Sequence, residues 1–316
     1  MIQEVLLRCK SASDRGCPSD AVGWVLYTLS DLGAACVRMR AEGRSSVSGA
    51  KPVWLANASD IRLRDYSNGH TDTRLVFDVP VLAEAAPEVF GRPEVWMSKP
   101  DPGDTAFDLL GDVLLDIEHR AFDSDRLDTR LLERLDGVLR SPVFCAVIDS
   151  LVITGARYTS DQPATLSARI ADLSAAMRTA TPSPQGGRIA GILSTLRPGT
   201  HAFGMTLDSG EEIAGVHASE DMRNLEPLLG GRAVVVGTVQ FRASGRMLRI
   251  DADIVKQAKP DESAIWSQMP RPRGRPLVAA ELWVPQDSSS GVAAIIGKWP
   301  GDETDEEIEV ALRELS

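Results

Sequence analysis

The sequence has only four cysteines, no recognisable secretory signal and no apolar run long enough to cross a bilayer. Cys9, Cys17, Cys36 and Cys145 show no CxxC spacing, which gives no sign of a zinc or redox motif. We expect them to be buried free thiols in a reducing compartment. Together these absences predict a cytoplasmic protein that does not associate with membranes.

The usual signatures of catalysis are also missing. The chain contains no GxSxG, GxxxxGK[S/T] or Rossmann glycine pattern, the motifs that present a nucleophile or bind phosphates. Its four histidines, His70, His119, His201 and His217, show no metal-ligand spacing. We therefore expect a protein that binds another macromolecule without catalysis and that needs no cofactor or metal. Residues distant in the sequence could still assemble a catalytic site.

The composition is that of an ordinary folded protein. Of its 316 residues, 43% are apolar and 25% are charged, a balance typical of globular domains. This length allows two or three domains. The formal net charge is -11, and an acidic surface disfavours non-specific binding to nucleic acid or anionic membranes.

Residues 1–158 are predicted to form a mixed α/β domain. The hydrophobic pattern indicates a strand at 4–9 and a helix that begins at Ser19 and ends near Gly33. Asn68-Gly69 is the favoured chemistry of a two-residue hairpin turn between two strand-like segments. The remaining expected elements are helices at 104–119 and 125–139 and a strand at 142–154.

Residues 159–186 are predicted to hold a short helix and a linker, and residues 187–256 to hold five strands. A helix is expected between the third and fourth strands, and this β-β-β-α-β-β order resembles an OB-fold, a small barrel. The fold class is therefore α+β or α/β with several domains. The expected strands are 188–196, 202–207, 212–216, 233–241 and 247–255, and the helix is 220–229.

Aspartates recur at four-residue steps along the expected helix 104–119. They fall opposite an apolar stripe, so we expect them to face water, where like charges at this spacing cost only a few tenths of a kcal/mol each. The alternative is a divalent-metal site formed by Asp112, Asp116 and His119. The aspartates are Asp104, Asp108, Asp112 and Asp116, and the stripe is Phe107, Leu110, Leu114 and Ile117.

The OB-like barrel raises nucleic-acid binding as an alternative function. Such barrels bind strands across their second and third strands and the flanking loops, which is where Arg197, Arg242 and Arg246 lie. Phe203 and Phe241 are the aromatic residues of this unit. In the alternation along their strands they fall on the side that carries the apolar core residues, so we expect them to be buried. We therefore favour a structural or protein-binding barrel.

Residues 257–316 are predicted to form an extended tail. The alternation of arginine and proline at 270–276 is expected to give a stiff, soluble linker. Trp266, Trp283 and Trp299 stand among prolines, glycines and serines, in no pattern that could build a core. They need cover from the parent domain or from a partner.

The end of the tail is predicted to be a short amphipathic helix. Thr304 and Glu307 form a capping box, and the acidic residues of the first turns suit the helix dipole. A helix this short is marginal alone, so it should form when its apolar stripe finds a groove. That stripe is Ile308, Ala311, Leu312 and Leu315.

The sequence GKWPGDETDEEI at 297–308 resembles the C-terminal segment of small bacterial proteins encoded beside PIN-domain ribonucleases in toxin–antitoxin pairs. In that family the segment is a peptide that wraps the nuclease and restrains it. The resemblance implies a regulatory, antitoxin-like protein whose tail binds a PIN-type nuclease encoded nearby. This chain is far longer than those proteins and has no typical DNA-binding domain at its N-terminus, so autorepression of an operon is not implied.

The expected partner-binding residues follow from the tail. Trp299 would be the buried anchor, the apolar stripe would face the partner's groove, and the acidic residues would complement a basic rim. The alternative is a terminal helix packed on its own protein. The full set is Trp299, Pro300, Asp302, Glu303, Asp305, Glu306, Glu307, Ile308, Leu312 and Leu315.

Overall fold

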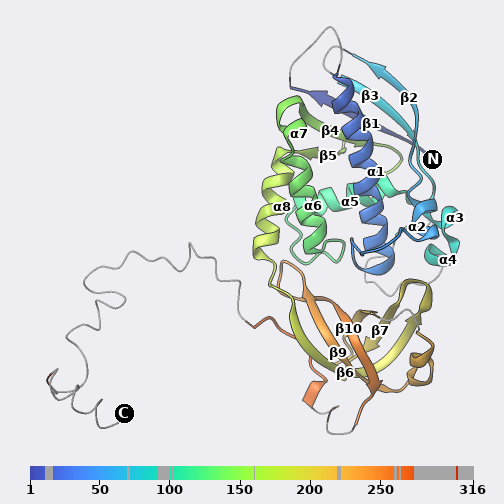
Figure 1. Cartoon of the computed structure of the whole chain (residues 1–316), viewed down its shortest axis with the longest axis vertical. Helices are drawn as coiled ribbons and strands as arrows, with labels where there is room; N and C mark the ends of the chain where they lie inside the picture. Colours follow the sequence, from blue (N-terminus) through green and yellow to red (C-terminus); the bar gives the residue numbers. More distant parts are fainter. Residues whose placement is uncertain are drawn as a thin grey trace. The chain divides into compact units, whose positions relative to one another are not determined.

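The computed structural model describes residues 1–10, 17–69, 72–91, 100–101, 103–159, 161–218, 222–259, 262, 265–273 and 304. The chain divides into two units, Met1–Pro276 and Leu277–Ser316. The first unit contains an α/β domain and a closed β-barrel (Figure 1). In the second unit only Thr304 is described, so the predicted terminal helix lies outside the described residues.

The α/β domain is built on a five-stranded antiparallel sheet in the order β2-β3-β1-β4-β5. Its buried apolar residues share one core with the helices. Phe77 of β3, for example, meets Phe107 of α5 edge-on, with ring centroids 5.3 Å apart. The strands are β1 (Ile2–Cys9), β2 (Arg62–Asn68), β3 (Asp72–Asp78), β4 (Ile148–Thr154) and β5 (Ala164–Ser167).

The helices of this domain vary greatly in length. They are α1 (Ser19–Glu42), α2 (Val53–Ala58), α3 (Leu82–Ala85), α4 (Pro87–Phe90), α5 (Ala106–Glu118), α6 (Thr129–Leu139), α7 (Pro142–Val147) and α8 (Ala168–Ala180). Within the described part of the chain, no helix combines the length and the apolar character that spanning a membrane requires.

Helix α1 is longer than predicted. It does not end near Gly33 but continues to Glu42, and Gly43 closes it in the left-handed conformation with φ 68°. A Cβ at Gly33 would lie 3.1 Å from Ile61 Cδ1 and 3.4 Å from Ala106 Cβ. This glycine therefore allows the start of α5 to pack closely on α1, and it is not a stop signal.

Two further local predictions need correction. The hairpin of β2 and β3 is confirmed, but Asn68 pairs with Thr73, so the turn follows Gly69 and is not centred on Asn68-Gly69. The segment 142–154 is not one strand. Pro142 lies in the first turn of α7, where proline is favoured and where Ser141 Oγ caps the helix, and β4 begins only at Ile148.

The predicted central helices are confirmed as α5 and α6. Each begins with a side-chain cap: Thr105 and Asp108 form a capping box at α5, and Asp128 accepts the Leu131 N–H at α6. The apolar stripe of Phe107, Leu110, Leu114 and Ile117 is fully buried.

The segment 159–186, predicted to be a separate helix and linker, contributes to the α/β domain. Strand β5 pairs with β4 at the edge of the sheet. Leu166 of β5 and Ile170 and Met177 of α8 are buried in the same core as the first strands. The barrel then begins at Gln185.

The barrel is closed in the order β10-β8-β7-β6-β9, with β8 and β10 parallel and every other pair antiparallel. This arrangement is consistent with the predicted OB-like barrel. Its elements are β6 (Gln185–Arg197), η1 (Pro198–Thr200), β7 (Ala202–Thr206), β8 (Glu212–His217), η2 (Arg223–Leu228), β9 (Arg232–Phe241) and β10 (Met247–Gln257).

The five strands agree closely with the predicted ranges, because alternation of apolar residues marks each strand and glycine-containing turns separate them. Phe203 and Phe241 are buried in the barrel core, as expected. The helix predicted at 220–229 is a 3-10 helix over Arg223–Leu228, with Pro227 inside it. Proline lacks the N–H that an α-helix would need there.

The glycines of α5 and α6 provide a matched test of this packing. A Cβ on Gly111 would lie 2.1 Å from the ring of Tyr158, whereas a Cβ on Gly137 would meet nothing within 4 Å. We expect Gly111→Ala to lower the free energy of unfolding by about 1–3 kcal/mol through overpacking. Gly137→Ala should raise it by about 0.5–1 kcal/mol through helix propensity. Urea unfolding measures both, and equal effects of the two substitutions would contradict this packing.

Candidate binding groove

The turn between β9 and β10 packs against the α/β domain. The Ser244 N–H donates to the carbonyl of Phe122 over 2.8 Å, and Arg242 Nη1 donates to the carbonyl of Asp123 over 2.7 Å. The Asp123 carboxylate accepts from Arg246 Nη1 over 2.6 Å and from Ser244 Oγ over 2.9 Å. This turn is thus fixed to the loop that follows α5.

Arg249 of β10 makes a second link between the barrel and the α/β domain. Its side chain is 8% exposed, and Nη1 donates to the carbonyl of Gly43, just after α1, over 2.7 Å. The guanidinium also lies 3.7 Å from Asp128 and 2.8 Å from Asp251. Asp128 is buried, caps α6 and accepts from the N–H and hydroxyl of Ser45. One buried carboxylate therefore joins the chain after α1, the start of α6 and the barrel.

The outer face of β7 and β8 is covered as well. Ala202 and Val216 pair across these strands and alternate with residues of the barrel core, so they point outward. Both are nevertheless buried. The 3-10 turn η1, which joins β6 to β7, contacts α4 of the α/β domain. In OB-like barrels this face and these loops form the usual ligand surface, and here part of the face is buried and both loops contact the α/β domain.

These contacts bear on the three arginines predicted to meet nucleic acid. Arg242 and Arg246 both pair with Asp123, at 3.5 Å and 2.6 Å. Arg197 ends β6 and is partly exposed. Nucleic-acid binding through this set stays a prediction, and it would require phosphates to compete with Asp123 for two of the three cations.

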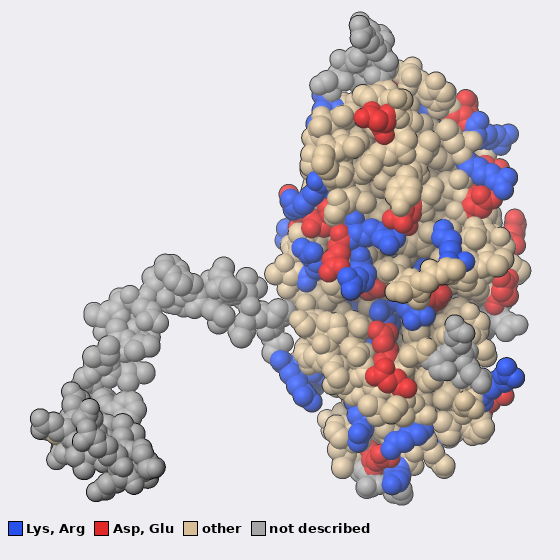
Figure 2. All heavy atoms as spheres, viewed as in Figure 1, with Lys and Arg blue, Asp and Glu red and all other residues tan. Residues whose placement is uncertain are grey.

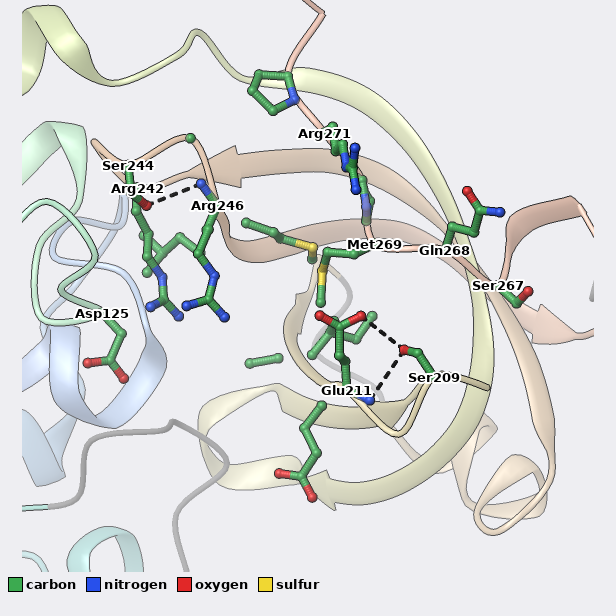
Figure 3. A pocket seen from close by; sticks show the side chains of 18 residues that line it. Asp125, Ser209, Glu211, Arg242, Ser244, Arg246, Ser267, Gln268, Met269 and Arg271 are labelled. Atoms are coloured by element: carbon green, nitrogen blue, oxygen red, sulfur yellow. Dashed lines mark hydrogen bonds between the residues drawn. The ribbon is translucent and has the colours of Figure 1, made fainter.

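A groove of about 960 Å³ opens between the β7–β8 hairpin, the β9–β10 turn and residues 267–272 (Figure 3). Its position follows from the barrel register, because the parallel pairing of β8 with β10 begins only at Gly215 and Ile250. Residues ahead of that register line the groove from both strands: Ile213, Ala214, Met247 and Leu248. The groove therefore lies where β8 and β10 are adjacent but not yet hydrogen-bonded to each other.

Residues 265–273, here called the strap, lie against the barrel. Met269 packs on the barrel core, and Trp266 lies 5.4 Å from the guanidinium of Arg188. The Arg273 N–H donates to Gln185 Oε1 over 2.9 Å. An apolar anchor, a cation–π contact and a hydrogen bond therefore hold the strap along its length. Residues 270–273, predicted to be a stiff, soluble linker, are held through the Arg273 N–H.

Side chains of both signs line the groove. Figure 3 shows Arg242 and Arg246 side by side at one end, with Asp125 beyond them, and Glu211 across the groove with its carboxylate bonded to Ser209 Oγ at 2.9 Å. The same mixing of charge is visible over the surface in Figure 2. Strand edges, apolar side chains and both charges suit an extended peptide better than a polyanion.

The aspartates of α5 do not form the solvated face that the sequence predicted. Asp104 and Asp108 are each only 3% exposed. Arg157 contacts Asp104 at 2.5 Å and Asp112 at 3.2 Å, and Arg126 contacts Asp116 at 3.1 Å. The guanidinium groups of Arg126, in the loop that follows α5, and of Arg157, which is distant in the sequence, thus neutralise these aspartates.

The alternative metal site gains no support from this geometry. Asp112 and Asp116 face arginines, and the described residues contain no group of three or more His, Cys, Asp or Glu side chains placed to hold a metal ion. His119 is the C-cap residue of α5.

Burial has a measurable electrostatic effect on this cluster. It raises the pKa of Asp104 from 3.8 to about 6, although the Asp101 N–H and Arg157 favour the ionised form. Burial also raises the pKa of Tyr158, whose hydroxyl donates to Asp112 Oδ1 over 2.7 Å. These residues form an internal polar network beside the core.

The cysteines also differ from expectation. Only Cys36 is buried, Cys9 and Cys17 are partly exposed, and Cys145 is exposed. The predicted partner-binding residues at 299–315 lie outside the described residues. Searches of family models, curated proteins and solved structures give no match to this chain.

Sequence reasoning missed the residues that position the groove. Met269 and Asp123 belong to no recognisable motif in the sequence. Arg249 looks like any exposed strand charge, because its partners Gly43 and Asp128 are far away in the sequence. The one indication in the sequence was the presence of large apolar side chains, Trp266 and Met269, beside a proline-rich segment, because such side chains are usually buried against another surface.

Docking of the strap can be tested by limited proteolysis. Arg271 precedes proline, so trypsin should cut the strap after Arg273. Met269→Asp removes the apolar anchor and should speed this cleavage several-fold, because cleavage requires local opening. Gln268→Asp, at an exposed neighbouring position, is the control and should leave the rate unchanged. Equal rates for all three proteins would contradict a docked strap.

The pKa of Asp104 predicts a pH effect on stability. Its folded pKa of about 6 exceeds the ordinary 3.8, so the folded protein binds this proton more tightly than the unfolded chain. The resulting stability is full below pH 4 and is lost as the pH rises through 6. Relative to wild type, Asp104→Asn should therefore gain about 1–3 kcal/mol between pH 4 and pH 7. Urea midpoints test this, with Asp253→Asn as the exposed control, and a gain that does not vary with pH would contradict it.

Proposed function

We propose that this protein is a non-catalytic regulatory binding protein whose C-terminal segment engages a protein partner. The observation that carries the proposal is the docked strap. The strap holds the chain against the barrel at Trp266, Met269 and Arg273, and the C-terminal unit begins at Leu277. The segment with the predicted anchors therefore starts from a fixed point on a folded body.

The body has the properties of a rigid support. The buried pair of Arg249 and Asp128 joins the barrel to the α/β domain, and breaking a buried pair is costly. The exposed Asp123 adds ion pairs with Arg242 and Arg246. A fixed starting point keeps a short binding segment close to a partner that also touches the body, which raises its effective concentration. The body would thus position the C-terminal segment for the partner, and the segment itself would supply the binding affinity.

The partner we propose is a PIN-domain ribonuclease encoded beside this protein, on the resemblance of residues 297–308. Trp299 is the proposed anchor in a pocket, since tryptophans dominate binding energy in many interfaces. Ile308, Leu312 and Leu315 would fill a groove as one helix face. The acidic residues at 302–307 would meet the basic surface that a nuclease uses for RNA.

Removal of the C-terminal segment tests this function. Truncation after Gly291 should abolish co-purification with the product of the adjacent gene, whereas the full chain should retain it. Trp299→Ala should weaken binding by about 30-fold or more, as expected for a buried aromatic anchor. Trp266→Ala is the matched control, because this tryptophan contacts the barrel, and it should change affinity little.

Two results would count against the proposal. Unchanged binding by the truncated chain would remove the tail from the interface. If Trp266→Ala weakened binding as much as Trp299→Ala, the strap and barrel would carry the interaction and the tail would not.

A further inference from the structure

Cys9 and Cys17 bring two thiols together at one end of the α/β domain. Their Sγ atoms are 3.0 Å apart, about 1 Å more than a disulfide bond. Cys9 is the last residue of β1, and Cys17 stands two positions before α1. The approach therefore joins the central strand of the sheet to the longest helix of the domain.

Both cysteines are held in place by backbone structure. Cys9 pairs with Ile148 of β4, and the next residue, Lys10, donates its N–H to the Val147 carbonyl over 2.9 Å. On the other side, the Pro18 carbonyl accepts the Val22 N–H in the first turn of α1. Ordered backbone on each side means that little conformational entropy opposes a bond between the sulfur atoms.

Exposure separates this pair from the other two cysteines. Cys9 and Cys17 are partly exposed at the edge of the core, whereas Cys36 is fully buried. Cys145 is exposed, and its thiol lies 3.7 Å from the Leu139 carbonyl. Cys9 and Cys17 alone combine a nearby thiol with access for a small oxidant.

We propose that Cys9 and Cys17 are a site of reversible oxidation, which closes to an intramolecular disulfide on reaction with a low-molecular-weight disulfide. The Cys9 thiolate attacks one sulfur of the oxidant, whose S–S bond breaks and releases a first thiol. The Cys17 sulfur then attacks Cys9 in this mixed disulfide and releases the second thiol. The two protein thiols lose two electrons and two protons, and the oxidant is reduced to two thiols.

Burial and the Cys9 sulfur raise the pKa of Cys17 to about 12. Cys17 is therefore a thiol at neutral pH in the reduced protein, and in the closing step its proton leaves with the second released thiol. The bond would fix the start of α1 to the sheet, while Arg249 of the barrel bonds the Gly43 carbonyl just after its end. Oxidation would thus secure the helix at both ends and raise the urea midpoint.

The test uses the full-length protein with Cys145→Ser, which removes the exposed thiol. After incubation with oxidised glutathione, we expect the intact mass to fall by two hydrogens and only one thiol, that of Cys36, to react with an alkylating agent after unfolding. Trypsin cuts after Lys10 and Arg15, so Cys9 and Cys17 fall in different peptides. A covalently linked pair of these peptides, lost on reduction, identifies the bond.

The controls keep the result interpretable. Cys9→Ser and Cys17→Ser in the same background should carry at most one glutathione adduct and should never lose two hydrogens. The wild-type protein shows that the oxidant is active by glutathionylation of Cys145. If Cys145 reacts while Cys9 and Cys17 stay reduced, or carry stable glutathione adducts without a linked peptide, the proposed site is wrong.

Discussion

The interaction on which the body depends is the buried contact of Arg249 with Asp128 and the Gly43 carbonyl. A guanidinium taken out of water needs partners for its charge and its N–H groups, and here the α/β domain supplies them. Loss of one partner would leave a buried charge unpaired, at a cost of about 3–5 kcal/mol. The barrel is therefore held by specific polar contacts as well as by apolar packing.

This contact determines which surfaces stay available. The outward-facing Ala202 and Val216 of β7 and β8 are buried, and the two loops where an OB-like barrel usually binds its ligand, η1 and the β9–β10 turn, contact the α/β domain. The groove between β8 and β10 remains accessible. The strap lines one side of this groove, with Met269 packed on the barrel core. A barrel whose usual ligand face is partly buried and against which the strap is docked suits a support for the C-terminal segment better than a receptor for nucleic acid.

Local pattern predicted the fold well and the site poorly. Alternating residues such as Phe203 and Met205 marked the barrel strands, and the stripe from Phe107 to Ile117 marked α5, because these signals need only neighbouring residues. Gly33 was misjudged because its role depends on Ile61 and Ala106. The aspartates of α5 were misjudged because Arg157 is distant in the sequence and Arg126 folds back from the loop after α5, outside the helical period. Long-range pairs leave no periodicity in a single sequence, so the polar contacts that build the groove could not be foreseen.

Amide hydrogen exchange of the full chain, with and without the purified product of the adjacent gene, tests the central claim most directly. The account predicts that binding slows exchange chiefly in 297–315, because the partner would cover these residues. Exchange in β8, β10 and the strap should change little. Protection concentrated on the barrel groove, with 297–315 exchanging as fast as in the free protein, would contradict the account.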